Sequence, residues 1–200
     1  MGNVLLQKQN EDIMIDLLNQ TNRYLSLYAN EEERLAPLFQ QFKLEFDILD
    51  RKTMPGHITA SGIGIEDGKM LMIFHPFLKR WLQPGGHIDK GETPLIAAQR
   101  EVLEETGRTS IVHPWHNENL IPFDIDVHFI PANHNKNELA HFHYDFRFLL
   151  IVDKSTQLEI KDQHLCKWIA IQNVEEKSLH ELINKLMHQN LLNSWDKNEK

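Results

Sequence analysis

The sequence predicts an α/β domain preceded by an N-terminal helical extension. Two segments, 124–130 and 140–152, alternate apolar and polar side chains, as the strands of a half-buried sheet do. Residues 93–107 carry the start and stop signals of a helix, and before residue 50 the apolar residues recur at helical spacing. Strands that alternate with an amphipathic helix favour a domain in which helices pack on a sheet.

Composition and charge limit the class of protein. The 200 residues suffice for one domain with a full core. A net charge of −8 argues against binding to nucleic-acid backbones, which needs a basic face. The single cysteine, Cys166, cannot form an internal disulfide, and no segment is typical of a membrane span or a secretory signal. We therefore expect a cytoplasmic protein that acts on a small molecule, without a membrane or nucleic-acid partner.

Two helices are expected before the sheet. Residues 10–27 show helical spacing, and a second helix begins near Asn30, with Pro37 causing a kink or a later start. We assign residues 1–52 to this extension and residues 53–195 to the main domain. The extension could be a cap on the sheet, a surface for homodimerisation or an element that selects the substrate. The sequence does not decide among these roles, nor does it give the oligomeric state.

The main domain opens with a predicted β-hairpin. Residues 57–65 and 69–74 read as strands, and Asp67-Gly68 supplies the turn between them. A last helix begins at a capping box formed by Ser178 and Glu181. Four further strands are expected, at 124–130, 140–152, 158–160 and 167–171.

The stretch from Gly86 to Gly107 gives the strongest signal in the chain. Thr93 can cap a helix that starts at Pro94, and Gly107 can end it, because glycine tolerates the left-handed conformation just past a helix. Apolar residues share one face of this helix and can pack on a sheet: Leu95, Ala98, Val102 and Leu103.

Three carboxylates, Glu101, Glu104 and Glu105, share another face of the same helix. Like charges at this spacing disfavour an isolated helix by roughly a few tenths of a kcal/mol per pair. A bound divalent cation would offset that repulsion, and hard carboxylate oxygens select Mg²⁺ or Mn²⁺. The alternative is a solvated acidic face, which a lone glutamate triplet usually is.

This triplet does not stand alone, because Gly86, Glu92 and Arg100 accompany it at fixed offsets. The whole pattern resembles the Nudix box, the signature of the Nudix hydrolases. The resemblance implies the Nudix fold, a mixed β-sheet sandwiched between helices. It also implies a metal-dependent pyrophosphatase that cleaves the phosphoanhydride of a nucleoside diphosphate derivative.

The resemblance also implies roles for individual residues. Glu101, Glu104, Glu105 and the carbonyl of Gly86 would be the metal ligands, and Glu104 or Glu101 would act as general base. Glu92 would hold Arg100, which in turn orients the carboxylates. Some family members recruit another acidic ligand from the loop between the late strands, for which Asp162 is a candidate and Glu159 the fallback.

One position departs from the family pattern. The residue after Gly107 is usually aliphatic, and here it is Arg108, which puts the packing of the helix exit in question more than the chemistry. The resemblance leaves two rival functions: a non-catalytic Nudix-fold nucleotide sensor and an enzyme like isopentenyl diphosphate isomerase. Intact charged positions in the box disfavour the sensor. The isomerases carry Cys-Gly-His where this chain has Gly85-Gly86-His87, so the reactive thiol is missing.

The polar face of the predicted strand 140–152 carries His141, His143, Asp145 and Arg147. Such a face is often only the wet side of an antiparallel sheet. It could instead bind a phosphorylated substrate, with Arg147 gripping a phosphate through two hydrogen bonds. His141 and His143 could also ligate a softer metal, although the lack of an accompanying cysteine disfavours this.

The box specifies a diphosphate and a metal but not the rest of the substrate. ADP-ribose, a dinucleotide, a nucleotide sugar and a nucleoside triphosphate are all compatible with it. We name His87, which directly follows Gly86, as a candidate contact to the substrate.

Overall fold

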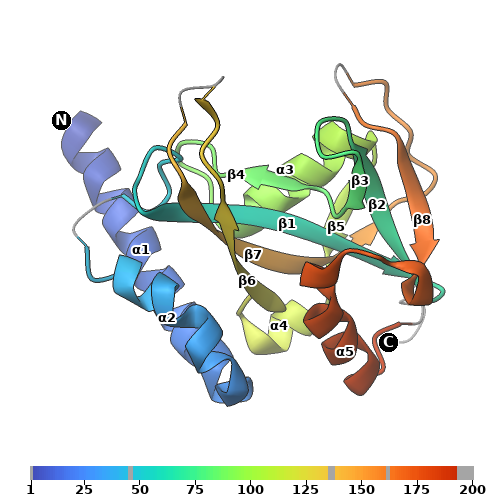
Figure 1. Cartoon of the computed structure of the whole chain (residues 1–200), viewed down its shortest axis with the longest axis horizontal. Helices are drawn as coiled ribbons and strands as arrows, with labels where there is room; N and C mark the ends of the chain where they lie inside the picture. The colour runs from blue at the N-terminus through green and yellow to red at the C-terminus, as the bar shows by residue number, and fades with distance from the viewer. Residues whose placement is uncertain (1, 45–46, 135–137, 161–162, 193–200) are drawn as a thin grey trace.

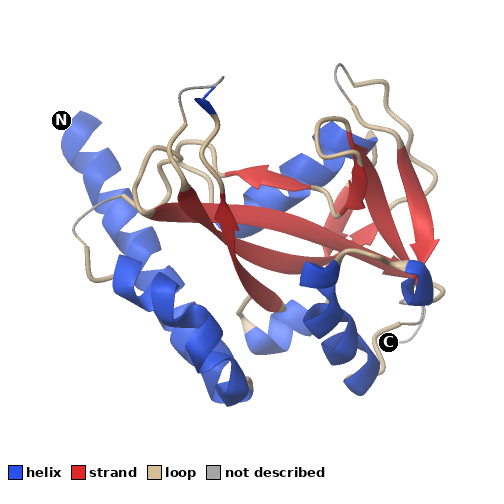
Figure 2. Cartoon of the chain, viewed as in Figure 1, coloured by secondary structure: helices blue, strands red, loops and turns tan. Residues whose placement is uncertain are grey.

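The structure is a computed structural model that describes residues 2–44, 47–134, 138–160 and 163–192, with side chains from Glu11 onward. Within these residues eight strands form one mixed sheet with helices on both faces (Figures 1 and 2), which confirms the predicted fold class. The long strands β1 (Gly56–Glu66) and β7 (His141–Val152) pair in parallel at its centre. The other pairings, all antiparallel, involve β2 (Lys69–His75), β3 (Arg80–Leu82), β4 (Gly85–His87), β5 (Ser110–Val112), β6 (Asp124–Ile130) and β8 (Cys166–Ala170).

The helices pack around this sheet in three groups. Helix α3 (Pro94–Thr106) packs on β1, β4 and β7, whereas α5 (His180–His188) buries its apolar side against a separate cluster on the sheet. Helices α1 (Gly2–Leu27) and α2 (Glu32–Gln41) lie beside β6. Shorter helical pieces include α4 (Trp115–Asn119) and the 3₁₀ turns Ala29–Glu31, Ile171–Asn173 and Lys177–Leu179.

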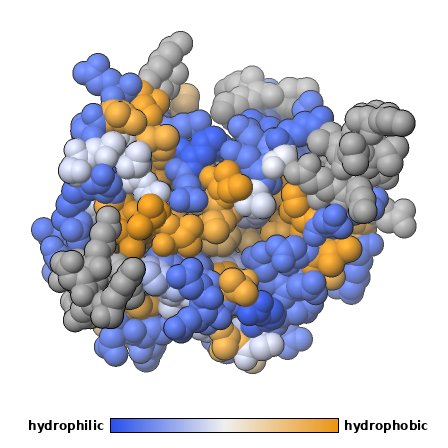
Figure 3. Space-filling model, turned by 180° about the vertical axis from the view of Figure 1, so that it is seen from behind, coloured by the Kyte–Doolittle hydropathy of each residue, from blue (hydrophilic) through white to orange (hydrophobic). Residues whose placement is uncertain are grey.

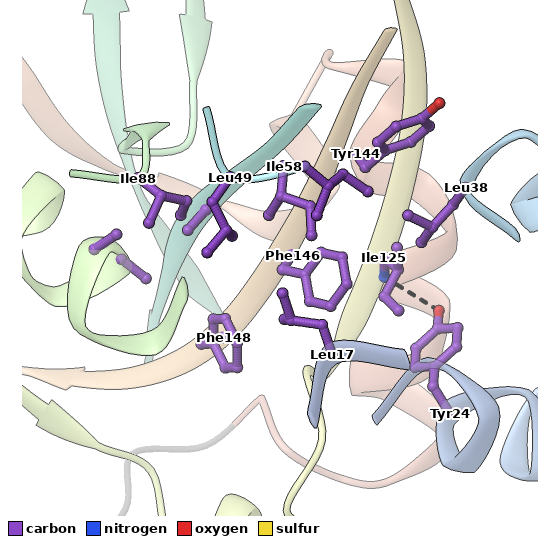
Figure 4. Close-up of a cluster of buried hydrophobic side chains, with 14 of the residues drawn as sticks. Leu17, Tyr24, Leu38, Leu49, Ile58, Ile88, Ile125, Tyr144, Phe146 and Phe148 are labelled. Carbon is purple, nitrogen blue, oxygen red and sulfur yellow. Dashed lines mark hydrogen bonds between the residues drawn. The ribbon is translucent and has the colours of Figure 1, made fainter. Parts of the chain in front are cut away.

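The N-terminal helices form part of the main core. Leu17 and Tyr24 of α1 and Leu38 of α2 are fully buried, and they point toward Ile125 of β6 and Phe146 of β7 (Figure 4). Burying such side chains stabilises the fold by roughly 25 cal/mol for each Å² of apolar surface removed from water. The two helices therefore cover the sheet as a cap, one of the three roles that the sequence left open.

The predicted ends of the central helix are confirmed. Oγ1 of Thr93 accepts a hydrogen bond from the backbone N–H of Ile96 (3.4 Å), and Pro94 is the first helical residue. Gly107 adopts a left-handed conformation (φ 69°), and its N–H donates to the carbonyl of Leu103 (2.8 Å). These caps fix the two ends of α3, the helix that carries the box carboxylates and packs on β4.

Two local predictions are wrong. Residues 158–160 are not a strand, because the N–H of Leu158 donates to the carbonyl of Gly107 (2.8 Å) rather than to a neighbouring strand. The capping box at Ser178 does not form either: α5 begins after Leu179, whose side chain makes no capping bond. Ser178 instead turns its carbonyl oxygen to Arg147 (2.7 Å).

Exposed apolar side chains form an interrupted band amid polar surface on the face opposite to the view of Figure 1 (Figure 3). Among the described residues, no helix combines the length and the apolar character needed to cross a lipid bilayer.

Candidate active site

The candidate active site lies where β4 passes under the box helix α3. Strand β4 pairs with β1, which sets Gly86 opposite Ala60. The backbone of Gly86 runs so close to Glu101 that an added Cβ would lie 2.5 Å from Oε1 of that carboxylate. A larger residue would push the Glu101 carboxylate aside, so glycine lets the backbone of β4 and this carboxylate share one small space.

Arg100 is the centre of the polar network in this site. Its Nε and one terminal nitrogen donate to Glu92 at 3.0 Å each. The other terminal nitrogen donates to Glu101 (2.7 Å) and Glu104 (3.1 Å), and the backbone carbonyl of His87 accepts a further bond (2.9 Å). One guanidinium thus fixes two of the three box carboxylates relative to β4.

The third carboxylate, Glu105, is held from the other side. Its Oε2 accepts a hydrogen bond from the backbone N–H of Gly85 (3.0 Å), and its Oε1 lies 3.3 Å from Nε2 of His164. His164, which lies in the segment between β7 and β8, is not among the site residues predicted from the sequence. Its only sequence signal was its position two residues after Asp162.

The electrostatics of the carboxylates favour a bound cation. Burial raises the pKa of Glu105 to about 8, and burial also raises the pKa of Glu101, against the opposing effect of Arg100. Partial burial acts to raise the pKa of Glu92 too, but the hydrogen bonds from Arg100 and from the N–H of Asp89, together with the charge of Arg100, outweigh it and lower the pKa. Buried carboxylates that resist ionisation alone become favourable anions beside a divalent cation.

The donor set fits a hard divalent ion. Glu101 and Glu105 are mostly buried, the side chain of Glu104 is 53% exposed, and all three offer oxygen ligands. The carbonyl of Gly86 lies beside them, because glycine lets the backbone approach Glu101. These residues would hold Mg²⁺ or Mn²⁺ with one side open to solvent.

Arg147 and Asp145 lie away from solvent, in a different network. The side chain of Arg147 is 1% exposed and donates to Asp145 (2.9 Å), Asp124 (3.0 Å) and Asp126 (3.1 Å). The carbonyl and hydroxyl of Ser178 accept its remaining bonds, so all five N–H groups are occupied. We therefore assign Arg147 to the support of the sheet and do not propose it as a phosphate ligand.

The structure brings the predicted residues His87, His141 and His143 together with His57 and His128. We call this group of five rings the histidine cluster: His57, His87, His128, His141 and His143. It spans β1, β4, β6 and β7, and it adjoins the box through His87, whose carbonyl binds Arg100.

Two further predictions concern the segment after β7. Asp162 lies outside the described residues, and Glu159 is exposed. Arg108, the departure from the family pattern, donates to the carbonyl of Lys154 (2.8 Å) and so ties the helix exit to the same segment.

Comparison with known proteins identifies the family. Residues 56–189 match the family model of the NUDIX domain, and the chain therefore belongs to the Nudix family. It is accordingly an enzyme of the class that acts on pyrophosphate bonds, and Nudix hydrolases generally use divalent metal ions.

Two curated relatives carry specific names. The chain is 33% identical over 140 residues to a probable DHNTP pyrophosphohydrolase of Lactococcus lactis subsp. cremoris, a match that covers 70% of this chain and 80% of the relative. It is 44% identical over 93 residues to an RNA pyrophosphohydrolase of Mesorhizobium japonicum, covering 41% and 53%.

Solved structures are more distant. A Nudix-family hydrolase of Clostridium perfringens has 24% identity and a TM-score of 0.49, over 66% of this chain and 97% of that one. An Ap4A hydrolase of C. elegans has 19% identity and the same TM-score, over 67% and 97%. Neither likeness bears on the substrate.

Proposed function

We propose that this protein is a Mg²⁺- or Mn²⁺-dependent hydrolase that cleaves the phosphoanhydride of a small nucleotide derivative. The observation that carries this proposal is the arrangement of Arg100 between Glu92 on one side and Glu101 and Glu104 on the other. When bound, the cation would neutralise diphosphate charge and lower the pKa of a water molecule.

Each residue of the box then has a defined task. Glu101 and Glu105, held by Arg100 and by the Gly85 N–H, present fixed oxygens to the cation. Glu104 is the most exposed of the three carboxylates and is best placed to accept a proton from an attacking water. Glu92 keeps Arg100 in position.

The geometry at Gly85 weighs against the isomerase alternative. A Cβ at this position would lie 2.3 Å from Oγ of Ser61 and 2.8 Å from the carbonyl oxygen of Ala60. The reactive cysteine of an isomerase would need to occupy this crowded place. Hydrolysis needs no side chain there.

The substrate panel should contain dihydroneopterin triphosphate, because the Lactococcus relative is named for it, beside ADP-ribose, dinucleotides, nucleotide sugars and nucleoside triphosphates. Small substrates should be tested before RNA, because a chain with a net charge of −8 lacks the excess of basic residues that binding to an RNA backbone needs.

The test replaces Glu104→Gln, which keeps the shape of the side chain and removes its charge. We expect kcat on the best substrate to fall by about 100-fold or more, with circular dichroism unchanged. Glu118→Gln, an exposed glutamate of α4, is the matched control and should keep full activity. An E104Q enzyme as fast as the parent would refute the assignment.

A further inference from the structure

The histidine cluster is not explained by hydrolysis at the box. The pairing of β1 with β7 sets His57 directly beside His143, and the ring of His141 lies within 5.0 Å of both. One ligand atom from each of these three rings can be chosen so that all lie within 4.8 Å of one another. Side chains from two strands thus converge on one point.

His57 is the residue that makes this arrangement unusual. It is 1% exposed, and neither ring nitrogen has a hydrogen-bond partner of ordinary geometry among the described residues. A weak contact with the backbone of Thr53 raises the pKa of His57 against the effect of burial. That contact can serve one ring nitrogen at most, so at least one buried nitrogen has lost its hydration without compensation and could bind a ligand.

His141 is already in the tautomer that binds a metal. Its Nδ1 lies 2.7 Å from the carbonyl oxygen of Leu139, and because a carbonyl only accepts, Nδ1 carries the proton. The lone pair is therefore on Nε2, which accepts a hydrogen bond from Nε2–H of His143 at 3.1 Å. An ion between the two Nε2 atoms would require the proton of His143 to move to its Nδ1. Metal-binding histidines commonly donate their other ring N–H to a carbonyl, a carboxylate or a water molecule, which fixes the orientation of the ring.

The charge state of the rings agrees with this geometry. Burial lowers the pKa of His57 to about 4 and that of His143 to about 2, and neighbouring rings add to the effect. Both are therefore neutral at pH 7, with the lone pairs that a metal ion requires.

We propose that His57, His141 and His143 bind a divalent transition-metal ion of the class of Zn²⁺, Ni²⁺ or Co²⁺, at a site separate from the carboxylates of the box. Imidazole suits these ions without any thiolate, whereas Mg²⁺ and Mn²⁺ prefer oxygen ligands. The absence of a nearby cysteine therefore does not weigh against a site of three histidines.

The distances fit with a modest adjustment. Ligands at about 2.0–2.1 Å from a tetrahedral ion lie roughly 3.3 Å apart, close to the separation of the two Nε2 atoms. No separation exceeds 4.8 Å, so the rings would need to close on the ion by at most about 1.5 Å. The bound ion would tie the start of β1 to the start of β7, beside His87 and the box.

The test measures ion binding directly in the full chain. The protein is stripped with a chelator and titrated with Zn²⁺, and separately with Co²⁺, in millimolar Mg²⁺ so that the hard carboxylate site is filled. We expect one equivalent of Zn²⁺ by calorimetry, a visible Co²⁺ spectrum typical of nitrogen ligands, and a rise in Tm on adding Zn²⁺.

Variants separate this site from the box. His141→Gln and His143→Gln should each weaken Zn²⁺ binding by at least about 10-fold and remove the Co²⁺ spectrum. His180→Gln, an exposed histidine of α5, and Glu104→Gln should both keep them. Circular dichroism checks the fold of each variant. If the parent binds no equivalent in Mg²⁺, or if E104Q loses the ion while H141Q and H143Q keep it, the site does not exist.

Discussion

The hydroxyl of Tyr24 lies 3.2 Å from Oδ1 of Asp124, and this contact joins the N-terminal helix α1 to the first residue of β6. The single proton of the hydroxyl is shared between Asp124 and Glu31, which also lies within hydrogen-bond distance. Nζ of Lys185 in α5 donates to the same Asp124 oxygen (2.6 Å). Helix α1, the 3₁₀ turn Ala29–Glu31, strand β6 and helix α5 therefore meet at one buried polar network.

We predict that Tyr24→Phe destabilises the whole protein. The change leaves the ring packed but removes the hydroxyl from buried Asp124 and Lys185, at a cost of about 1–3 kcal/mol. Urea unfolding should give a lower midpoint in a single transition. Tyr28→Phe, which loses only the bond from exposed Gln189 (2.8 Å), is the control and should change little. An unchanged midpoint in Y24F would mean that apolar packing alone holds α1.

Arg147→Met should be far more damaging than an ordinary loss of an ion pair. It leaves three buried carboxylates, Asp124, Asp126 and Asp145, without their shared counter-charge, and breaking a buried pair costs about 3–5 kcal/mol. The control is Lys154→Met, whose partly exposed pair with Glu66 is worth about 1 kcal/mol or less. A stable R147M protein with a raised KM would instead support a phosphate-binding role.

Stability should depend on pH through His116. Its Nδ1–H donates to the carbonyl of Ile121 (2.9 Å) while Nε2 accepts from the N–H of Leu149 (2.9 Å), which leaves no place for a second proton. Burial lowers the pKa of His116 to about 4. Between about pH 6.5 and pH 4 the unfolded chain binds a proton that the folded chain does not, so the free energy of unfolding falls as the pH falls.

The size of this effect is measurable. At pH 5 it amounts to about 2 kcal/mol relative to pH 7, from urea unfolding at each pH. His116→Gln does not titrate; it should be less stable at pH 7 yet show a shallower decline toward pH 5. If the free energy of unfolding declines equally with pH in both proteins, the pKa of His116 in the folded protein is not lowered.

Alanine at the two adjacent glycines of β4 should separate chemistry from folding. The Cβ of Gly86→Ala meets the flexible carboxylate of Glu101, so we expect Glu101 to shift, kcat/KM to fall by about 10–100-fold and stability to hold. The Cβ of Gly85→Ala meets the backbone of Ala60 and Ser61, which cannot give way, so that variant should lose stability. If folded G86A kept full activity, the close approach of the Gly86 backbone to Glu101 would not be needed for catalysis.

The sequence by itself determined the parts of this protein that depend on neighbours along the chain. Thr93 and Gly107 fix the ends of the box helix through bonds within a few residues, and the 124–130 segment alternates because successive side chains of a strand face opposite ways. The family pattern, read at fixed offsets, likewise predicted the enzyme class. Such signals can be recognised in a sequence because the residues that interact lie close together along the chain.

Only the tertiary structure decided which distant residues meet. His57 joins His143 because β1 pairs with β7 in one parallel register, and a shift of one residue would have turned either ring to the other face. Arg147 is surrounded by aspartates of β6 and β7 rather than open to phosphate, since the partner strand and Ser178 supply its acceptors. Strand register and helix docking are set by the packing of the whole core, so no local pattern contains them.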